Sequence, residues 1–413
     1  MSPTPRAAAL FGAVALLVLV LPLWAVLLAE LALAAATVTD ALLVRAVPVV
    51  ERDVPANLYR GVPAQLRLTV LAAAGPVRLR QAMPPDLRLE PAEDDGGLDG
   101  RLVARRRGRH VLPAPAARTL GPLRLGCWYR RPGEETEVTV YPDLPAARRL
   151  ALAVRQGRFR LEGRTRGPLG VGTEFEFVRE YLPDDDIRQV NWRATERMGR
   201  PMSNQYRVER DRDVVCVVDT GRLMTAPLGD RTRLDAAVDA AVAVAAVADE
   251  VADRVGAIAF ERTVTRFVPP RRRGARAVVT ALHDVEPVAS DSDYERAFTL
   301  VGDSKRALVF VFTDLLDDAA TRPLVDAVPM LARRHAVVVV SATDPDLVGM
   351  TAREPASEVE VYEAAAALDV LAARTRARQL LLAAGAEVLE AGPERLASLC
   401  IGAYLRAKAR VRI

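Results

Sequence analysis

Histidine and cysteine are scarce in this sequence, with three of each among 413 residues. The cysteines are far apart and form no short-spaced pair, which fits a reducing compartment better than a disulfide framework. The histidines are isolated as well, so neither a zinc-type spacing nor a Ser/His/Asp or Cys/His arrangement can be built. The residues concerned are Cys127, Cys216, Cys400, His110, His283 and His335. We therefore expect that this protein is not an enzyme, has no catalytic residue and binds no cofactor tightly.

The sequence also lacks an excess of either charge. Its 57 basic and 53 acidic residues leave a formal charge of +4, whereas nucleic-acid binders usually have a marked basic excess or patch. We therefore expect no nucleic-acid partner. Half of the residues are hydrophobic, which is enough for buried cores, and the length predicts two or three folded parts.

One long apolar stretch lies near the N-terminus. Residues 7–29 carry no charge, and apolar character continues to Val44 with Glu30 and Asp40 as interruptions. The stretch is about twice the roughly 20 residues that one membrane span needs. Pro22 stands where two short helices would reverse, so the sequence favours a transmembrane helical hairpin within residues 1–46, with helices over about 7–22 and 24–44.

Arginines flank this stretch on both sides, at Arg6 before it and at Arg45, Arg52 and Arg60 after it. By the positive-inside rule, both ends of the hairpin and the domains that follow are expected to be cytoplasmic at the plasma membrane. Two alternatives stay open: a cleaved signal peptide, and a single tilted span with the remaining chain outside.

In the rest of the chain, the pattern of polar and apolar residues changes twice. Residues 47–145 alternate polar and apolar side chains over short runs, as in residues 64–70, which predicts a small all-β sandwich-like domain. Residues 146–210 are polar and irregular. From residue 211 to 413, continuous apolar runs alternate with helical patterns, which predicts an α/β fold with a doubly wound, mostly parallel sheet.

The expected strands of this last part are residues 214–218, 255–260, 264–268, 307–312 and 336–340, and the expected helices are residues 234–251, 291–302, 317–334, 357–384 and 393–408. Sites in such sheets form outside the carboxyl ends of strands. Asp219 and Asp314 lie at two of these ends, each beside a threonine, and they are candidate ligands for Mg²⁺. Capping of the following loops or helices is the alternative role for both.

Residues 172–197 interleave acidic, arginine and aromatic residues with too few apolar positions for a core element. The pattern favours an internal ion-pair network over direct binding of a partner. Our hypothesis is a structural clasp between the β-rich part and the α/β part.

The same segment resembles the signature of a bacterial family named domain of unknown function 58. The residues in register are Gly172, Glu174, Phe175, Arg179, Tyr181, Asp185, Asp186, Arg188, Trp192 and Arg197. The resemblance implies a von Willebrand factor A-like domain at the C-terminal side and a paired N-terminal membrane segment. It also implies a MoxR-type AAA+ ATPase as partner.

The chain departs from the family in ways that bear on metal binding. Metal-binding von Willebrand domains have Asp-x-Ser-x-Ser after the first strand, whereas this chain has Gly221 and Leu223 at the two serine positions. At most weak Mg²⁺ binding is expected. The resemblance implies a membrane-anchored, non-enzymatic adaptor or scaffold in cell-envelope assembly or stress handling. A metal-dependent hydrolase using Asp219 and Asp314, and an extracellular adhesion protein, are the alternatives.

Overall fold

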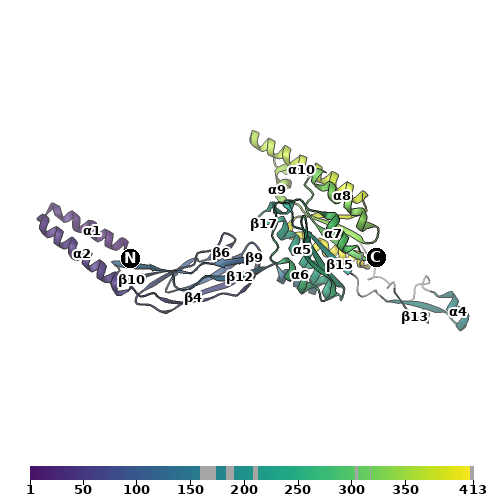
Figure 1. Cartoon of the computed structure of the whole chain (residues 1–413), viewed down its shortest axis with the longest axis horizontal. Helices are drawn as coiled ribbons and strands as arrows, with labels where there is room; N and C mark the ends of the chain where they lie inside the picture. The colour runs from purple at the N-terminus through teal and green to yellow at the C-terminus, as the bar shows by residue number, and fades with distance from the viewer. Residues whose placement is uncertain (159–173, 183–189, 208–212, 303–305, 317, 410–413) are drawn as a thin grey trace. The chain divides into compact units, whose positions relative to one another are not determined.

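The computed structural model describes residues 1–158, 174–182, 190–207, 213–302, 306–316 and 318–409 (Figure 1). The chain forms two compact units, Met1–Tyr141 and Pro142–Ile413. The predicted division into four parts, at residues 1–46, 47–145, 146–210 and 211–413, is finer than this and stays a prediction.

The first unit begins with two apolar helices that lie side by side (Figure 1). Helix α1 (Pro5–Leu16) is followed by one 3₁₀ turn, η1 (Leu17–Leu19), and then by α2 (Leu23–Leu43), with Pro22 as the N-cap of α2. Among the described helices, α2 is long and apolar enough to cross a membrane by its length and composition. Insertion of the two helices as a transmembrane hairpin stays a prediction.

The remainder of this unit consists of three sheets around one core. The sheet orders are β2-β4-β8-β6, β1-β11-β10-β5-β7 and β3-β12-β9. The strands are β1 (Ser2–Pro3), β2 (Val49–Asp53), β3 (Asn57–Tyr59), β4 (Ala64–Ala72), β5 (Val77–Arg80), β6 (Leu87–Glu90), β7 (Glu93–Asp95), β8 (Gly97–Ala104), β9 (Gly108–Leu112), β10 (Ala116–Leu120), β11 (Gly126–Arg130) and β12 (Thr136–Tyr141). Alternate residues of β4, such as Leu66 and Leu68, enter the shared core because successive side chains of a strand point to opposite faces.

The second unit is built on a six-stranded sheet in the order β19-β18-β15-β20-β21-β22. All neighbouring strands are parallel except β19, which pairs antiparallel with β18 at one edge. The strands are β15 (Asp213–Asp219), β18 (Arg254–Phe260), β19 (Val264–Arg272), β20 (Ala307–Phe312), β21 (Ala336–Ala342) and β22 (Glu387–Ala391). Every residue of β15 and β20 is buried, as expected for strands covered on both faces.

Helices cover both faces of this sheet. Val214, Cys216 and Val218 of β15 pack into one core, and Val215 and Val217 into the other. The first core contains residues of α3 (Leu144–Arg155), α5 (Arg233–Glu250), α6 (Ala275–Leu282) and α11 (Pro393–Ala409). The second contains residues of α7 (Tyr294–Val301), α8 (Asp318–Ala332) and α10 (Glu358–Ala383). Helix α9 (Pro345–Ala352) packs against α10.

The structure differs from the sequence-based expectation at α3, which lies in a stretch that we expected to be irregular. Asp143 caps this helix by accepting the Ala146 N–H at 2.9 Å. Ala147 and Ala151 are buried in the first core, where small side chains allow close packing of α3 on α5. The arginines of α3 made the segment look polar, although its alanine face is apolar.

Candidate functional site

The candidate site lies at the carboxyl edge of the six-stranded sheet. Strands β15 and β20 are neighbours and parallel, with Val218 opposite Phe312, so the residues that follow them meet at this edge. Asp219 ends β15 and is 1% exposed, and Asp314 follows β20 and is 4% exposed. Both carboxylates therefore lie at strand ends, as the sequence indicates, and both are buried.

Asp219 is held by neutral donors. Its Oδ1 accepts the Gly221 N–H at 2.8 Å and the Ser292 hydroxyl. Its Oδ2 accepts the Thr313 hydroxyl at 2.7 Å and the Tyr294 hydroxyl at 3.0 Å. A carboxylate has about four lone-pair positions, so these four donors fill its accepting capacity.

Ser292 supplies a hydroxyl donor to Asp219 from the loop before α7. A Cβ atom added to Gly221 would lie 2.2 Å from Ser292 Oγ and 2.7 Å from the Ser290 carbonyl oxygen. Glycine at 221 is therefore required for the approach of the loop before α7. Ser292 lies 73 positions from Asp219 along the chain.

Tyr294 links the two strand ends. Its hydroxyl contacts Asp219 and lies 2.9 Å from Thr313 Oγ1. Burial, followed by the negative charge of Asp219, raises the pKa of Tyr294 well above its usual value. The phenol therefore stays neutral and acts as a hydrogen-bond donor to Asp219 rather than as a base.

Asp314 is held by charged donors instead. Its Oδ1 accepts from Arg233 at 2.6 Å and from Arg374 at 2.9 Å, and the Ser341 hydroxyl lies at 3.1 Å. The side chains of the two arginines are 7% and 4% exposed. Arg374 also pairs with Glu390 at 3.3 Å. Two guanidinium groups thus occupy the space and supply the positive charge that a cation would otherwise bring to Asp314.

These contacts do not fit a divalent metal site. The acceptor positions of Asp219 are filled, and Asp314 is compensated by two arginines. No group of three or more His, Cys, Asp or Glu residues is suited to a metal in the part of the chain that the structure describes. A metal would have to displace both sets of donors.

The cysteines and His335 offer no reactive group at this edge. All three cysteines are buried, and burial raises the pKa of Cys216 to about 12. Burial lowers the pKa of His335, whose Nδ1 accepts the Ala307 N–H at 3.1 Å. The ring therefore supports the start of β20, at the opposite end of that strand from Asp314.

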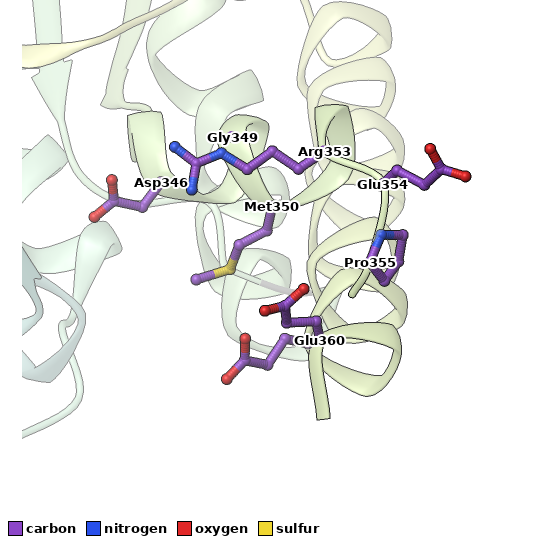
Figure 2. A pocket seen from close by; sticks show the side chains of 8 residues that line it. Asp346, Gly349, Met350, Arg353, Glu354, Pro355 and Glu360 are labelled. Atoms are coloured by element: carbon purple, nitrogen blue, oxygen red, sulfur yellow. The ribbon is translucent and has the colours of Figure 1, made fainter. Parts of the chain in front are cut away.

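The surface of the second unit, where the structure describes it, includes the two hollows that follow. One, of about 280 Å³, opens beside Asp219 and its donors Ser292 and Tyr294 and is lined by Arg222, Leu223, Ser290, Asp291, Ser292, Tyr294, Ala319, Ala320 and Pro323. The other, of about 310 Å³, lies between α9 and α10 and is mainly acidic. Figure 2 shows the Met350 side chain there, between the carboxylates of Asp346 and Glu360.

The signature segment is described only in part. Its backbone forms β13 (Glu174–Glu180), α4 (Trp192–Met198) and the pairing of β13 with β14 (Met202–Arg207). Trp192 is 70% exposed, and Asn191 caps α4 by accepting the Ala194 N–H at 3.0 Å.

Other signature residues fall on the same elements or outside them. Glu174, Phe175 and Arg179 are in β13, Tyr181 follows it, and Arg197 is in the last turn of α4. Gly172, Asp185, Asp186 and Arg188 lie outside the described residues. The clasp hypothesis stays a prediction.

Sequence reasoning missed five residues that complete the site: Arg233, Arg374 and Ser341 at Asp314, and Ser292 and Tyr294 at Asp219. Along the chain, Arg233, Arg374 and Ser341 lie 81, 60 and 27 positions from Asp314, and Ser292 and Tyr294 lie 73 and 75 positions from Asp219. Arg233 stands in the first turn of α5, where its positive charge is unfavourable to the helix dipole, and this was the one available signal.

Comparison with known families and proteins gives one family match. The model of the family described as "Protein of unknown function DUF58" matches residues 177–352, which include Asp219 and Asp314. Uncharacterized protein Mb1516 of Mycobacterium bovis and uncharacterized protein Rv1480 of Mycobacterium tuberculosis are each 29% identical over 219 residues. The alignment covers 49% of this chain and 66% of each relative, which is just under two thirds of their length.

Likenesses to solved structures are local. The cohesin module of a family 33 glycoside hydrolase from Clostridium perfringens has a TM-score of 0.16 at 9% identity and covers 23% of this chain and 98% of its own. Superoxide reductase (neelaredoxin) from Ignicoccus hospitalis has a TM-score of 0.14 at 14% identity and covers 22% and 80%. Neither bears on function at these scores. The informative similarity is to the family of unknown function over residues 177–352.

Proposed function

We propose that this protein is a membrane-anchored, non-enzymatic adaptor or scaffold that presents its α/β unit to a MoxR-type AAA+ ATPase. The observation that carries the proposal is the state of the two strand-end carboxylates. Asp219 and Asp314 are both buried and held by groups of the protein itself, so neither is available to activate water or to hold a catalytic metal. The partner and the process, cell-envelope assembly or stress handling, come from the family resemblance.

The α/β unit is, in this proposal, von Willebrand factor A-like. In order of appearance along the chain, its six strands are arranged 3-2-1-4-5-6, with the third antiparallel at the edge. This doubly wound order places ligands outside the carboxyl ends of the central strands. Here the two carboxylates at those ends are already engaged, Asp314 by Arg233 and Arg374 and Asp219 by its four donors, which favours a role carried by the surface of the unit.

Membrane anchoring is proposed to involve both N-terminal helices. Ser2 and Pro3, which precede α1, pair with Cys127 and Gly126 of β11. The chain that follows α2 enters the same β-sandwich. Because one folded domain lies on one side of a bilayer, this pairing argues against a single span that leaves the N-terminus on the far side. It supports a hairpin with both ends on the side of the domains, which the flanking arginines make cytoplasmic.

A surface that fits a protein partner lies on α9 and the first turns of α10. Exposed apolar side chains, such as Val359 at 65% and Tyr362 at 75%, stand there among acidic residues. The adjoining hollow is lined by Asp346, Glu354, Glu360 and Glu363, with Arg353 as its basic residue. Large exposed aromatic and aliphatic residues of this kind are typical anchors of protein interfaces. The acidic surroundings fit a partner segment with basic side chains.

The proposal is tested by capturing partners of the full-length protein in native membranes. With ATPγS present, we expect an AAA+ ATPase to be enriched over a sample with no nucleotide. Tyr362→Ala combined with Val359→Ala should reduce this enrichment at least tenfold. The matched control is Met330→Ala combined with Leu300→Ala, two exposed apolar residues on α8 and α7, which should leave it unchanged.

Two outcomes would contradict the proposal. One is the absence of any AAA+ ATPase among the captured proteins. The other is a hydrolytic activity of the purified protein that requires Asp219, since the hydrolase alternative depends on that carboxylate.

A further inference from the structure

We infer that residues 121–126, a turn between β10 and β11, form a contact surface for anionic lipid headgroups at the base of the two N-terminal helices. This inference rests on the proposed membrane anchoring. It adds a second membrane-contacting element, from a part of the sequence about 80 residues away from α2, and fixes which end of the β-sandwich faces the bilayer.

The first observation is a buried carboxylate that ties the turn to α2. Asp40, in the last turn of α2, is 1% exposed and accepts three backbone N–H groups of the turn. The donors are Leu123 at 2.8 Å, Leu125 at 2.8 Å and Gly126 at 2.9 Å. Trp128 adds an indole N–H bond to the Ala41 carbonyl oxygen at 2.7 Å. The turn is therefore fixed at the level of the C-terminal end of α2.

The second observation is that the start of α1 is tied to the same turn. The Thr4 N–H donates to the Leu125 carbonyl oxygen at 2.9 Å, and the Thr4 hydroxyl donates to that of Arg124 at 2.6 Å. Thr4 is also the N-cap of α1. The two helices therefore leave the β-sandwich at one level, and residues 121–126 lie at that level too.

Close approach is secured by two glycines. A Cβ atom on Gly121 would lie 2.3 Å from the Asp40 carboxylate, and one on Gly126 would lie 2.5 Å from the Ala41 Cβ. The turn thus has no room for side chains on the face toward α2. Its remaining face is exposed, with Pro122 and Leu123 at the tip.

The exposed face has the composition of a membrane interface. Leu123 is 58% exposed, Leu43 at the end of α2 is 65% exposed, and Arg45 and Arg124 are exposed. Arginine keeps its charged head in water or among headgroups while its stem covers apolar surface. Near an anionic bilayer, such basic residues are attracted to the lipid surface.

The two helices and the strand residues that flank the turn carry more basic than acidic residues. Residues 1–48 and 118–130 contain five arginines, and their acidic residues are Glu30 and Asp40. Asp40 is already engaged by three N–H groups, and Glu30 lies in the middle of α2. An anionic bilayer is complementary to this surface and is continuous with the proposed helical anchor, so it is the occupant that we propose.

The test attaches an environment-sensitive fluorophore to one introduced cysteine at a time in the full-length protein. The three native cysteines are buried and so are protected from labelling. Leu123→Cys reports the turn, Leu19→Cys reports the tip between the helices, and Val111→Cys on β9 is an exposed control in the β-sandwich. The protein is reconstituted into nanodiscs of phosphatidylcholine with or without phosphatidylglycerol, with quenchers at the headgroup or in the acyl chain.

We expect the quencher in the acyl chain to quench the label at position 19. The quencher at the headgroup should quench the label at position 123, and neither quencher should affect the label at position 111. Quenching at 123 should increase at least twofold with phosphatidylglycerol. Arg45→Gln combined with Arg124→Gln should remove that increase, whereas Arg67→Gln combined with Arg88→Gln, two exposed arginines of the sandwich, should not.

The outcomes separate the two proposals. If the label at position 19 is quenched while the label at position 123 behaves like the one at position 111, membrane anchoring is supported and the lipid-contact inference is wrong. If the label at position 19 is not quenched, membrane anchoring itself is wrong. An emission spectrum at 123 that is the same in detergent and in nanodiscs would mean that protein covers the turn, and would also overturn the inference.

Discussion

The ends of two neighbouring strands in the second unit hold buried carboxylates in opposite ways. Asp219 accepts from an amide and three hydroxyls, whereas Asp314 is paired with the guanidinium groups of Arg233 and Arg374. Both follow central parallel strands of the same sheet, so the backbone does not explain the difference. The difference comes from side chains that the surrounding helices and loops contribute. A strand end therefore fixes where a carboxylate lies, and distant residues decide what it can bind.

The largest expected effect is at Asp314. Asp314→Ala leaves two buried guanidinium groups without their carboxylate, and we expect the free energy of unfolding to fall by about 3–5 kcal/mol. The measurement is chemical unfolding of the full-length protein. Asp326→Ala, which breaks an exposed pair with Arg322, is the control and should cost about 0–1 kcal/mol. Equal losses in the two variants would show that the Asp314 pairs are not buried as described.

Asp219→Ala should cost less, about 1–3 kcal/mol, because it leaves polar but uncharged donors without an acceptor. The hydroxyls of Ser292 and Thr313 can rotate toward other acceptors, which limits the loss. The same unfolding measurement ranks the two variants. A cost at Asp219 that exceeds the cost at Asp314 would reverse the comparison.

A smaller effect is expected from Ser292→Ala, about 1 kcal/mol, since Asp219 keeps three of its four donors. Ser398→Ala on α11, a half-buried serine whose hydroxyl donates to the Arg395 carbonyl oxygen, is the matched control and should be close to neutral. If Ser292→Ala is also neutral, the Ser292 hydroxyl does not help to hold Asp219.

Local sequence patterns were enough to predict the main strands and helices of the α/β unit. The apolar run at residues 307–312 is β20 without change, because a strand buried on both faces needs apolar residues throughout. Strand β22 (Glu387–Ala391) was missed, since only Val388 and Leu389 are buried in it and two of its five residues are acidic. An edge strand with few buried residues has no hydrophobic pattern that distinguishes it from a loop in the sequence.

The candidate site was predictable only as far as it depends on local sequence. The strand ends at Asp219 and Asp314 follow from the apolar runs before them. The arginines that pair with Asp314 are on α5 and α10. A single sequence does not show which side chains that are distant along the chain lie in contact. Likewise, the local sequence around Asp219 did not indicate that the Ser292 hydroxyl from another loop donates to it. The predicted loss of a metal ligand at position 221 stays a prediction.

The central claim is that both strand-end carboxylates are occupied by the protein's own donors, and divalent metal tests it most directly. A ligand that binds only the folded state stabilises it by about 2.7 kcal/mol at a hundredfold excess over Kd. We predict that millimolar Mg²⁺ leaves the Tm of the full-length protein unchanged, both in the parent and in Asp219→Ala. A saturable rise in Tm with Mg²⁺ that disappears in Asp219→Ala would contradict the claim and restore the strand ends as a metal site.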